Sequence, residues 1–191
     1  MDVRPLPTDF DAEAPLQSDL LTLRPMTEAD RTDLSKAASD PGIWAGHPAS
    51  DRWKPAAFKP YFDFLLEAGG TMTARDTKGR AIGISRFYHS ADAPDGIGIG
   101  FTFLVRDHWG GATNFAMKQL MVDHIFAHRP EVWFHIAPTN IRSQKATTKL
   151  GAGRIADAVL DLGTGPADWV RMVLRPDAWK AVHAARSEMK T

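Results

Sequence analysis

Short stretches of alternating or continuous apolar residues recur along the chain and predict β-strands, whose side chains point to opposite faces in turn. Glycine, proline and aspartate punctuate them, and the turn-like segment Asp76–Arg80 joins two of them into a predicted hairpin. The predicted strands are Leu20–Met26, Thr71–Asp76, Ala81–Tyr88, Ile97–Val105, Val132–Ile136, Gly153–Leu160 and Asp168–Leu174.

Four further stretches predict helices, at residues 27–40, 55–70, 112 to about 128, and 140–151. Thr27 is a good N-cap residue for the first, and glycines stop the second and the last. Pro60 lies inside the second stretch and predicts that a new helix starts there. Residues 44–55 are rich in glycine, proline and aromatic residues and are predicted to form a loop.

The order of elements is therefore β-α-α-β-β-β-α-β-α-β-β, which predicts a single α/β domain built on a mixed sheet. Residues 1–18 carry acids and prolines where a signal peptide needs a basic and then an apolar stretch, so we expect a poorly ordered tail or arm. We expect the domain itself over residues 19–176 and a helical tail over residues 177–191.

The chain has 23 basic and 23 acidic side chains among 191 residues, so its net charge provides no general attraction to nucleic acid or to an anionic membrane. It has no cysteine, which excludes disulfides, thiolate metal sites and cysteine nucleophiles and suits a reducing cytoplasm. No apolar run approaches the roughly 20 residues that span a bilayer. We therefore expect a cytoplasmic protein without nucleic-acid or membrane partners.

Gly110 and Gly111 stand between a predicted strand and a predicted helix. The first N–H groups of a helix have no partner within the helix, and they lie at the positive end of its dipole. Glycine lets an anion approach this backbone closely, so the junction is a candidate diphosphate site. The alternative is a plain tight turn, since neither the P-loop nor the dinucleotide-binding signature is present here.

Three stretches in order resemble the GNAT superfamily of acetyl-coenzyme A-dependent N-acetyltransferases: LLTLRPMTEAD, HWGGATNFAMKQLMVDHIF and NIRSQKATTKLGA. The resemblance is nearest to the branch that contains the ribosomal-protein N-terminal acetyltransferases, whose Trp-Gly-x-Gly/Ala turn corresponds to Trp109–Ala112, and it covers roughly residues 18–175. It implies a GNAT-like mixed, mostly antiparallel central sheet flanked by helices. Strands 4 and 5 of that fold, here Ile97–Val105 and Val132–Ile136, would splay apart.

The resemblance also implies transfer of an acetyl group from acetyl-coenzyme A to a primary amine, which is either a small molecule or a protein N-terminus. The pantetheine arm would lie between the splayed strands, where backbone groups near Leu104 and Val105 would bind it. Residues implied to contact the diphosphate or the rest of the cofactor are Gly110, Gly111, Ala112, Thr113, Asn114, Asn140, Ser143 and Lys145. For Lys145 the alternative is a solvated basic helix face.

The sequence departs from the family pattern at three positions. Asp107 stands where the glycine signature prefers Gln or Arg, Thr147 stands where many members place a tyrosine acid, and Gly98 stands where related sequences often carry a carboxylate. The general acid and base are therefore not identified by resemblance. This leaves open a non-catalytic acyl-coenzyme A-binding or interaction protein and a different acyl donor.

His135 is the best candidate catalytic residue, because a histidine on a splayed strand suits proton transfer near neutral pH. The alternative is a buried, hydrogen-bonded histidine. Candidate acceptor-binding residues are Trp44, His47, Arg86 and Tyr88. His124 and His128 are one helical turn apart but lack a third ligand, so no metal is expected. A homodimer is implied by the resemblance alone.

Overall fold

The computed structural model describes residues 1–188, and residues 189–191 lie outside this description. The strands are β1 (Val3–Arg4), β2 (Leu16–Gln17), β3 (Leu21–Pro25), β4 (Thr71–Asp76), β5 (Ala81–Ser90), β6 (Gly96–Leu104), β7 (Glu131–Ile136), β8 (Gly153–Asp161) and β9 (Pro166–Leu174). The helices are α1 (Arg31–Ala37), α2 (Pro41–Trp44), α3 (Pro55–Ala68), α4 (Ala112–Phe126), α5 (Ile141–Thr148) and α6 (Pro176–Glu188), with 3₁₀ turns η1 (Glu28–Asp30) and η2 (Arg106–His108). The predicted order of strands and helices is confirmed.

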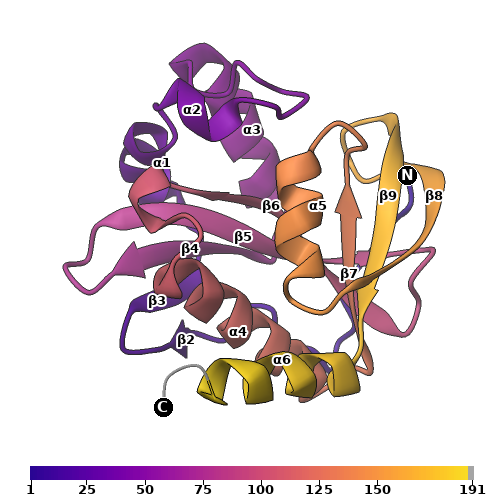
Figure 1. The fold of residues 1–191 in the computed structure, drawn as a ribbon. Coiled ribbons are helices and arrows are strands. Elements are labelled where there is room, and N and C mark those ends of the chain that lie inside the picture. Colours follow the sequence, from indigo (N-terminus) through magenta and orange to yellow (C-terminus); the bar gives the residue numbers. More distant parts are fainter. Residues whose placement is uncertain (189–191) are drawn as a thin grey trace.

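The strands form one mixed sheet in the order β2-β3-β4-β5-β6-β7-β9-β8, and β1 pairs with the far end of β5 (Figure 1). All neighbours are antiparallel except β6 and β7, which are parallel. This parallel pair extends only from Gly96 opposite Glu131 to Gly98 opposite Trp133. Beyond it the two strands diverge, which confirms the splayed pair that the family resemblance implied.

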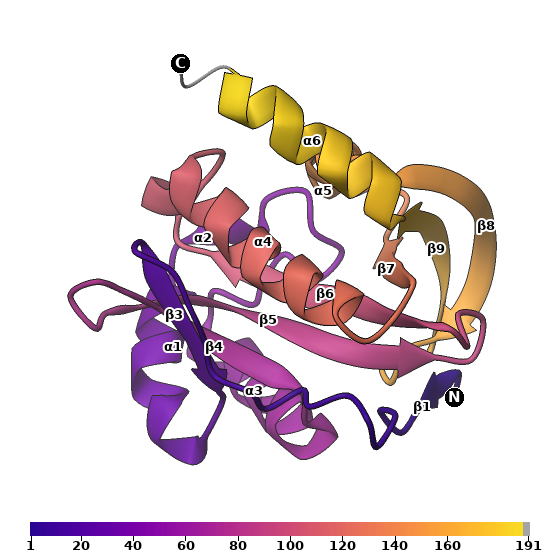
Figure 2. The ribbon, with the colours of Figure 1, turned by 90° about the horizontal axis from the view of Figure 1, so that it is seen from below.

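Helices cover both faces of the sheet, and Figure 2 shows α4 and α6 on one side and α1 and α3 on the other. On the α4 side Met117 and Met121 are fully buried in one apolar cluster with Ile97. On the α3 side Phe58 and Phe62 are buried in a second cluster. Each such side chain stabilises the fold by about 1.5–3 kcal/mol relative to its exposed state. No described helix has both the length and the apolar character that crossing a membrane requires.

Two predicted helices have different limits in the structure. The first prediction, residues 27–40, divides into η1 and α1, and Asp30 accepts a hydrogen bond from the Thr27 N–H at 2.9 Å. The second does not restart at Pro60, because α3 continues through it as one helix that begins with Pro55. Proline costs a helix one backbone hydrogen bond, and here the buried face formed by Phe58, Phe62 and Leu65 keeps the helix intact.

The two terminal segments pack on the domain. Phe10 is only 4% exposed, and its ring meets Phe87 at 5.3 Å and His124 at 5.0 Å between ring centres. The expectation of a poorly ordered tail over residues 1–18 is corrected by this contact, because an aromatic side chain in the core holds the segment in place as an arm. At the other end Trp179 of α6 is buried beside Phe115, while the last three residues of the expected helical tail lie outside the description.

We predict that Phe10→Ala lowers the free energy of unfolding by about 3 kcal/mol, because it removes a buried aromatic side chain and leaves a cavity. Leu20→Ala is the matched control, since Leu20 is 41% exposed and its loss is expected to cost less than about 0.5 kcal/mol. Urea denaturation measures both. Equal stability of the two variants would show that the N-terminal arm contributes nothing.

Candidate functional site

The edge of β6 that faces the gap is shaped by a β-bulge. Between the pairs Ile84–Phe103 and Arg86–Gly100, two residues of β6 lie opposite one residue of β5. Phe101 takes a left-handed φ of 52°, which is uncommon for a residue other than glycine, and its carbonyl accepts a hydrogen bond from the Tyr61 hydroxyl at 3.1 Å. Such a bulge bends the strand and redirects its side chains next to the gap.

Backbone groups at the end of β6 are only partly free. The Val105 N–H donates to the Ile82 carbonyl at 2.8 Å, so among the backbone groups near Leu104 and Val105 expected to bind the cofactor this one is already occupied. Alternation along an antiparallel pair then directs the backbone of Leu104 toward the gap. The Leu104 carbonyl accepts the indole N–H of Trp109 at 2.7 Å, which leaves the Leu104 N–H as the backbone donor for a ligand.

The glycine turn has the open geometry that an anion site needs. Gly110 has a φ of 64°, a left-handed value that favours glycine, and Gly111 is the N-cap of α4. A side chain at Gly110 would meet nothing within 4 Å, and one at Gly111 would meet only the Trp109 carbonyl oxygen at 3.9 Å. The N–H groups of Ala112, Thr113 and Asn114 begin the helix and have no partner within it.

Helix α5 closes the other side of the gap. Asn140 caps it, because its side-chain oxygen accepts the Ser143 N–H at 3.2 Å, so part of the polar capacity expected for a ligand serves the helix. Lys145 is exposed. Arg142, which was not among the predicted site residues, lies 4.1 Å above the Trp109 ring and donates to the Ile43 carbonyl at 2.9 Å. It therefore links α5 to the glycine turn and to α2.

Three glycines of β6 form a flat floor under two aromatic rings. A side chain at Gly96 would come within 2.4 Å of Trp133, and one at Gly98 within 2.4 Å of Tyr88. Gly100 is similarly covered by Tyr88, at 2.9 Å. The alternate glycines of this strand are thus explained by the space that the rings occupy. The tyrosine ring fills the position where a family carboxylate on β6 would lie.

Across this floor Tyr88 reaches His135 on β7. The Tyr88 hydroxyl lies 2.6 Å from His135 Nδ1, and His135 Nε2 lies 3.2 Å from an Asp92 carboxylate oxygen. Arg171 Nε lies 2.6 Å from the same oxygen, and Ser90 donates to the other one. The polar chain Tyr88–His135–Asp92–Arg171 therefore links β5 to β7 across the glycines of β6 and continues to β9.

The charges of this chain define its protonation. Burial raises the pKa of the Asp92 carboxyl, but hydrogen bonds from His135 and Ser90 and the charge of Arg171 outweigh it, so the pKa falls below its ordinary value. Because the carboxylate is ionised, His135 Nε2 donates to it, and Nδ1 accepts from the Tyr88 hydroxyl. Burial raises the pKa of that hydroxyl and keeps it protonated. The His135 side chain is wholly buried, and Tyr88 is 1% exposed.

The predicted acceptor residues occupy different surroundings. Trp44 is buried and its indole N–H donates to the Ala38 carbonyl, so it anchors the chain between α2 and α3. Half-buried His47 has its pKa lowered to about 4 by burial and by the charges of Arg52 and Arg142, so it is neutral at pH 7. Arg86 is 4% exposed and donates to the Ala68 and Gly69 carbonyls at the end of α3.

Lys118 of α4 is a further group at the bulge. Its ammonium donates to Thr102 at 2.9 Å and Ser85 at 3.4 Å, and these two hydroxyls lie 2.7 Å apart. Thr102 is exposed on the edge of β6, whereas Lys118 is half-buried and forms no ion pair with any described residue. Burial lowers the pKa of Lys118 to about 7, so a large fraction of this amine is neutral at physiological pH.

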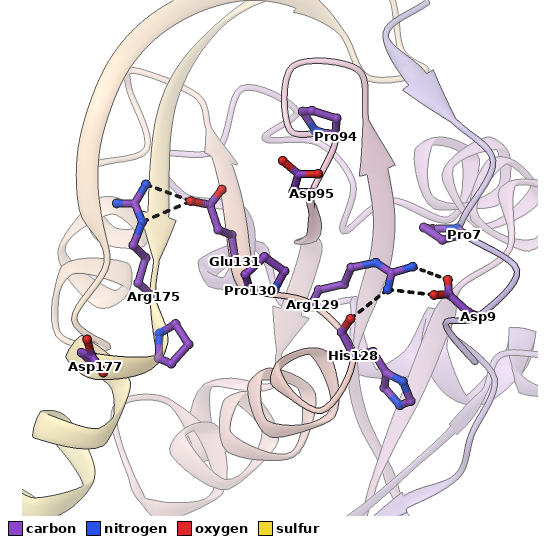
Figure 3. Close-up of a pocket in the computed structure, with 11 residues that line it drawn as sticks. Pro7, Asp9, Pro94, Asp95, His128, Arg129, Pro130, Glu131, Arg175 and Asp177 are labelled. Carbon is purple, nitrogen blue, oxygen red and sulfur yellow. Dashed lines mark hydrogen bonds and ion pairs between the residues drawn. The ribbon is translucent and has the colours of Figure 1, made fainter.

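A separate hollow of about 850 Å³ lies between the N-terminal arm, the C-terminal end of α4 and the start of α6 (Figure 3). Its arginines are compensated, because Arg129 pairs with Asp9 and Arg175 pairs with Glu131. It lies at the end of α4 opposite to the glycine turn. Among the described residues no group of acids and histidines is arranged to hold a metal ion. We therefore place the candidate site at the β6–β7 gap.

Comparison with known proteins bears on the family of this domain. The family model described as acetyltransferase (GNAT) domain matches residues 21–153. This range includes β3, β6, β7, the glycine turn and α5. The chain belongs to the GNAT acetyltransferase family. A comparison with curated protein sequences gave no match.

Solved GNAT structures share the fold at low sequence identity. A GCN5-related N-acetyltransferase from Brucella melitensis superimposes with a TM-score of 0.73 at 16% identity, covering 98% of this chain and 88% of that one. RimJ from Mycobacterium smegmatis, solved with CoA-disulfide, gives 0.61 at 16% identity over 90% and 93% of the two chains. Spermidine N-acetyltransferase from Vibrio cholerae, solved with CoA and spermine, gives 0.57 at 13% identity over 85% and 99%.

Within this GNAT domain several polar residues of the site were not foreseen from the sequence, namely Arg52, Asp92, Lys118 and Arg171. Most are far apart in the chain, and only their placement on facing elements makes them neighbours. A signal did exist for Asp92, which follows Ser90 in the turn after a strand and is a typical hydrogen-bond acceptor there. The buried Thr147 gives no acid at the position of the family tyrosine.

We predict that Lys118→Met stabilises this GNAT domain, and more at low than at high pH. The pKa of Lys118 falls from 10.5 in the unfolded chain to about 7 in the folded protein, so between these pH values the folded protein binds fewer protons than the unfolded chain. The buried lysine therefore lowers the free energy of unfolding fully below pH 7, and this effect disappears as the pH rises to about 10.5. We expect a gain on the order of 2 kcal/mol at pH 6.5, after allowance for partial exposure. Urea denaturation at pH 6.5 and 9.5 measures it, with exposed Lys149→Met as control. A gain independent of pH would contradict the assignment.

Proposed function

We propose that the protein transfers an acetyl group from acetyl-coenzyme A to a primary amine by direct attack. The observation that carries this proposal is the gap between β6 and β7, which has the open N-terminus of α4 at one end and a hydrogen-bonded bulge beside it. In a GNAT domain, this arrangement combines an anion site with a groove for an extended arm.

Backbone donors would hold most of the cofactor. The N–H groups of Gly110–Asn114 would bind the diphosphate at the positive end of the α4 dipole. The Leu104 N–H would bind the pantetheine or polarise the thioester carbonyl, and such a donor is worth about 3–4 kcal/mol in a transition state. Ser143 and the Asn140 amide lie at the start of α5 and would bind the pantetheine, whereas exposed Lys145 would reach an adenosine phosphate.

The reaction requires a neutral amine next to the thioester. The amine nitrogen forms a bond to the thioester carbon, the carbon–sulfur bond breaks, and the nitrogen loses a proton while the coenzyme A thiolate gains one. Holding the two reactants in a near-attack geometry supplies roughly 7–11 kcal/mol, so positioning dominates in this proposal. Trp44 and His47 would border the amine together with Arg86 and Tyr88, the latter two from beneath the bulge.

His135 would contribute a smaller part of the rate enhancement, and it would act through Tyr88. Its Nδ1 accepts from the Tyr88 hydroxyl, and that hydroxyl lies over the glycine floor where the strands begin to diverge. Asp92 holds the imidazole in the tautomer that keeps Nδ1 an acceptor. A proton taken up along this chain would be stabilised by the Asp92 carboxylate. General acid–base help of this kind is worth about 10²–10⁴-fold.

The finer assignment is to the branch of ribosomal-protein N-terminal acetyltransferases, which would make a protein N-terminus the acceptor. The Trp109-Gly110 turn and the similarity in fold to RimJ support it. A small-molecule amine remains the other acceptor class, and a homodimer stays a prediction of the family resemblance. The second candidate function is non-catalytic binding of acyl-coenzyme A. The buried Thr147 and the full burial of His135 favour it, because neither presents an exposed acid or base.

We predict that Gly111→Val weakens acetyl-coenzyme A binding at least tenfold in isothermal calorimetry, because its side chain would stand where the diphosphate meets the helix N-terminus. Gly111 has a φ of −95°, and a side chain there would meet no protein atom closer than 3.9 Å, so the fold should tolerate valine. Gly153→Val is the matched control, since a side chain at that position also meets nothing within 4 Å and lies on β8. Unchanged affinity of Gly111→Val would remove the diphosphate assignment.

We predict that His135→Gln and Tyr88→Phe each lower kcat by 10- to 10⁴-fold and alter its dependence on pH between 6 and 9, with little effect on acetyl-coenzyme A affinity. The double variant should lose no more than the worse single one, because the two residues act in one chain. Thermal denaturation controls for folding. A loss beyond about 10⁴-fold in a folded variant would contradict dominance of positioning, and no loss would make His135 purely structural.

A further inference from the structure

Two guanidinium groups, those of Arg52 and Arg86, lie against aromatic rings beside the bulge. Arg52 stacks on the Tyr61 ring at 3.8 Å, and Arg86 lies 5.2 Å from the ring of Phe101. Tyr61 donates to the Phe101 carbonyl, so these four residues form one bulge cluster. Burial raises the pKa of Tyr61 to about 12, against the opposing effect of the Arg52 and Arg86 charges.

Neither arginine has an acidic partner. Among the described residues, Arg52 and Arg86 form no ion pair, and Arg86 Nη1 is buried without a hydrogen-bond partner. Two other arginines near the site are paired with acids, Arg106 with Asp40 and Arg171 with Asp92, whereas Arg142 rests on the Trp109 ring and the Ile43 carbonyl. Burying two positive charges without a counter-ion costs free energy. A bound anion would act as the counter-ion and offset that cost.

The surroundings provide aromatic faces in place of acids. Arg52 also lies 5.7 Å from the Trp44 ring and Arg86 lies 5.7 Å from Phe64, so cation–π contacts position both groups without neutralising them. Asp51 is exposed on the loop next to Arg52 and forms no ion pair with a described residue, and Asp63 is held by Arg31 and Lys59. The bulge cluster therefore keeps a positive field.

We infer that the acceptor amine carries a carboxylate, which binds half-buried Arg52, while Arg86 supplies a second positive charge from below. This inference rests on the proposed function, which puts the thioester at the same bulge. A carboxylate paired with Arg52 through its planar fork would orient the amine toward the β6–β7 gap. An acceptor with a second ammonium group, such as a polyamine, would place a like charge beside Arg52 and be disfavoured.

Three acceptors with four carbon atoms each isolate the effect of the second group: 4-aminobutyrate, butylamine and 1,4-diaminobutane. Each has a primary amine at one end, and the other end is a carboxylate, a methyl group or an ammonium group. Three short peptides that begin Ala-Asp, Ala-Asn and Ala-Lys repeat the comparison for a protein N-terminus. Release of coenzyme A thiol gives kcat/KM for each. In one of the two series, we expect kcat/KM of the acidic acceptor to exceed that of the neutral acceptor at least tenfold, and the basic acceptor to have the lowest kcat/KM. The series in which this preference occurs tells whether the acceptor is a small molecule or a protein N-terminus.

Arg52→Gln should reduce that preference to less than threefold, mainly by raising KM, and Arg52→Lys should keep part of it. Arg24→Gln is the matched control, because Arg24 is exposed on β3, away from the bulge. Thermal denaturation checks that each variant folds. Equal or better turnover of the neutral or basic acceptors, or an unchanged preference in folded Arg52→Gln, would overturn the inference and leave the proposed function standing.

Calorimetry with acetyl-coenzyme A tests the proposed function separately from the inference about the acceptor. Absence of binding would overturn the proposed function itself. Binding without turnover of any of these six acceptors would overturn the inference, because an amine beside a carboxylate would then not be sufficient for recognition.

Discussion

The incomplete pairing of β6 with β7 is the constraint on which the rest of the structure depends. Parallel strands satisfy their backbone groups only as far as they stay in register, and here the register ends at Gly98 and Trp133. Everything beyond that pair must find other partners. The structure supplies a tryptophan indole for Leu104, a tyrosine hydroxyl for Phe101 and a neighbouring strand for Val105, and it leaves the remaining edge for a ligand.

The same divergence explains why polar groups gather at the closed end of the gap. Strands that separate lose their ladder of backbone hydrogen bonds, and near that point the chain from Tyr88 to Arg171 connects β5 with β7 and β9 through side chains that pass over β6. The glycine floor makes this possible, because any side chain at Gly98 would collide with the Tyr88 ring. The Tyr88 ring thus accounts for the missing carboxylate at Gly98, and it brings the tyrosine–histidine pair above that glycine.

Charge is distributed unevenly around the gap. Several arginines away from the gap are paired with acids, as Arg75 is with Asp30 and Arg129 is with Asp9. At the bulge, Arg52 and Arg86 on one face and Lys118 on the other have hydroxyls, carbonyls or aromatic rings as neighbours. Burial of unpaired cations lowers stability and lowers the pKa of all three groups, which come from a loop, β5 and α4 and meet around the bulge of β6.

Much of the fold could be predicted from local pattern, because alternation and turn residues act over a few neighbours. The strands from β3 to β9, the hairpin of β4 and β5 and the helix after the glycine turn follow from such patterns. Family resemblance added the splayed pair. The arm of residues 1–18 could not be predicted, since its order depends on Phe10 reaching Phe87 and His124 across the sheet.

The sequence by itself determined the glycine turn, whose chemistry is that of bare backbone at a helix start, and the N-cap at Asn140. Only the tertiary structure decided what His135 and Tyr88 contact, that the Val105 N–H is occupied, and that Arg52 and Arg86 come together around Tyr61 and Phe101. The reason is physical. A cap or a turn depends on residues within about one helical turn, whereas desolvation and charge pairing depend on every element that packs nearby, whatever its distance along the chain.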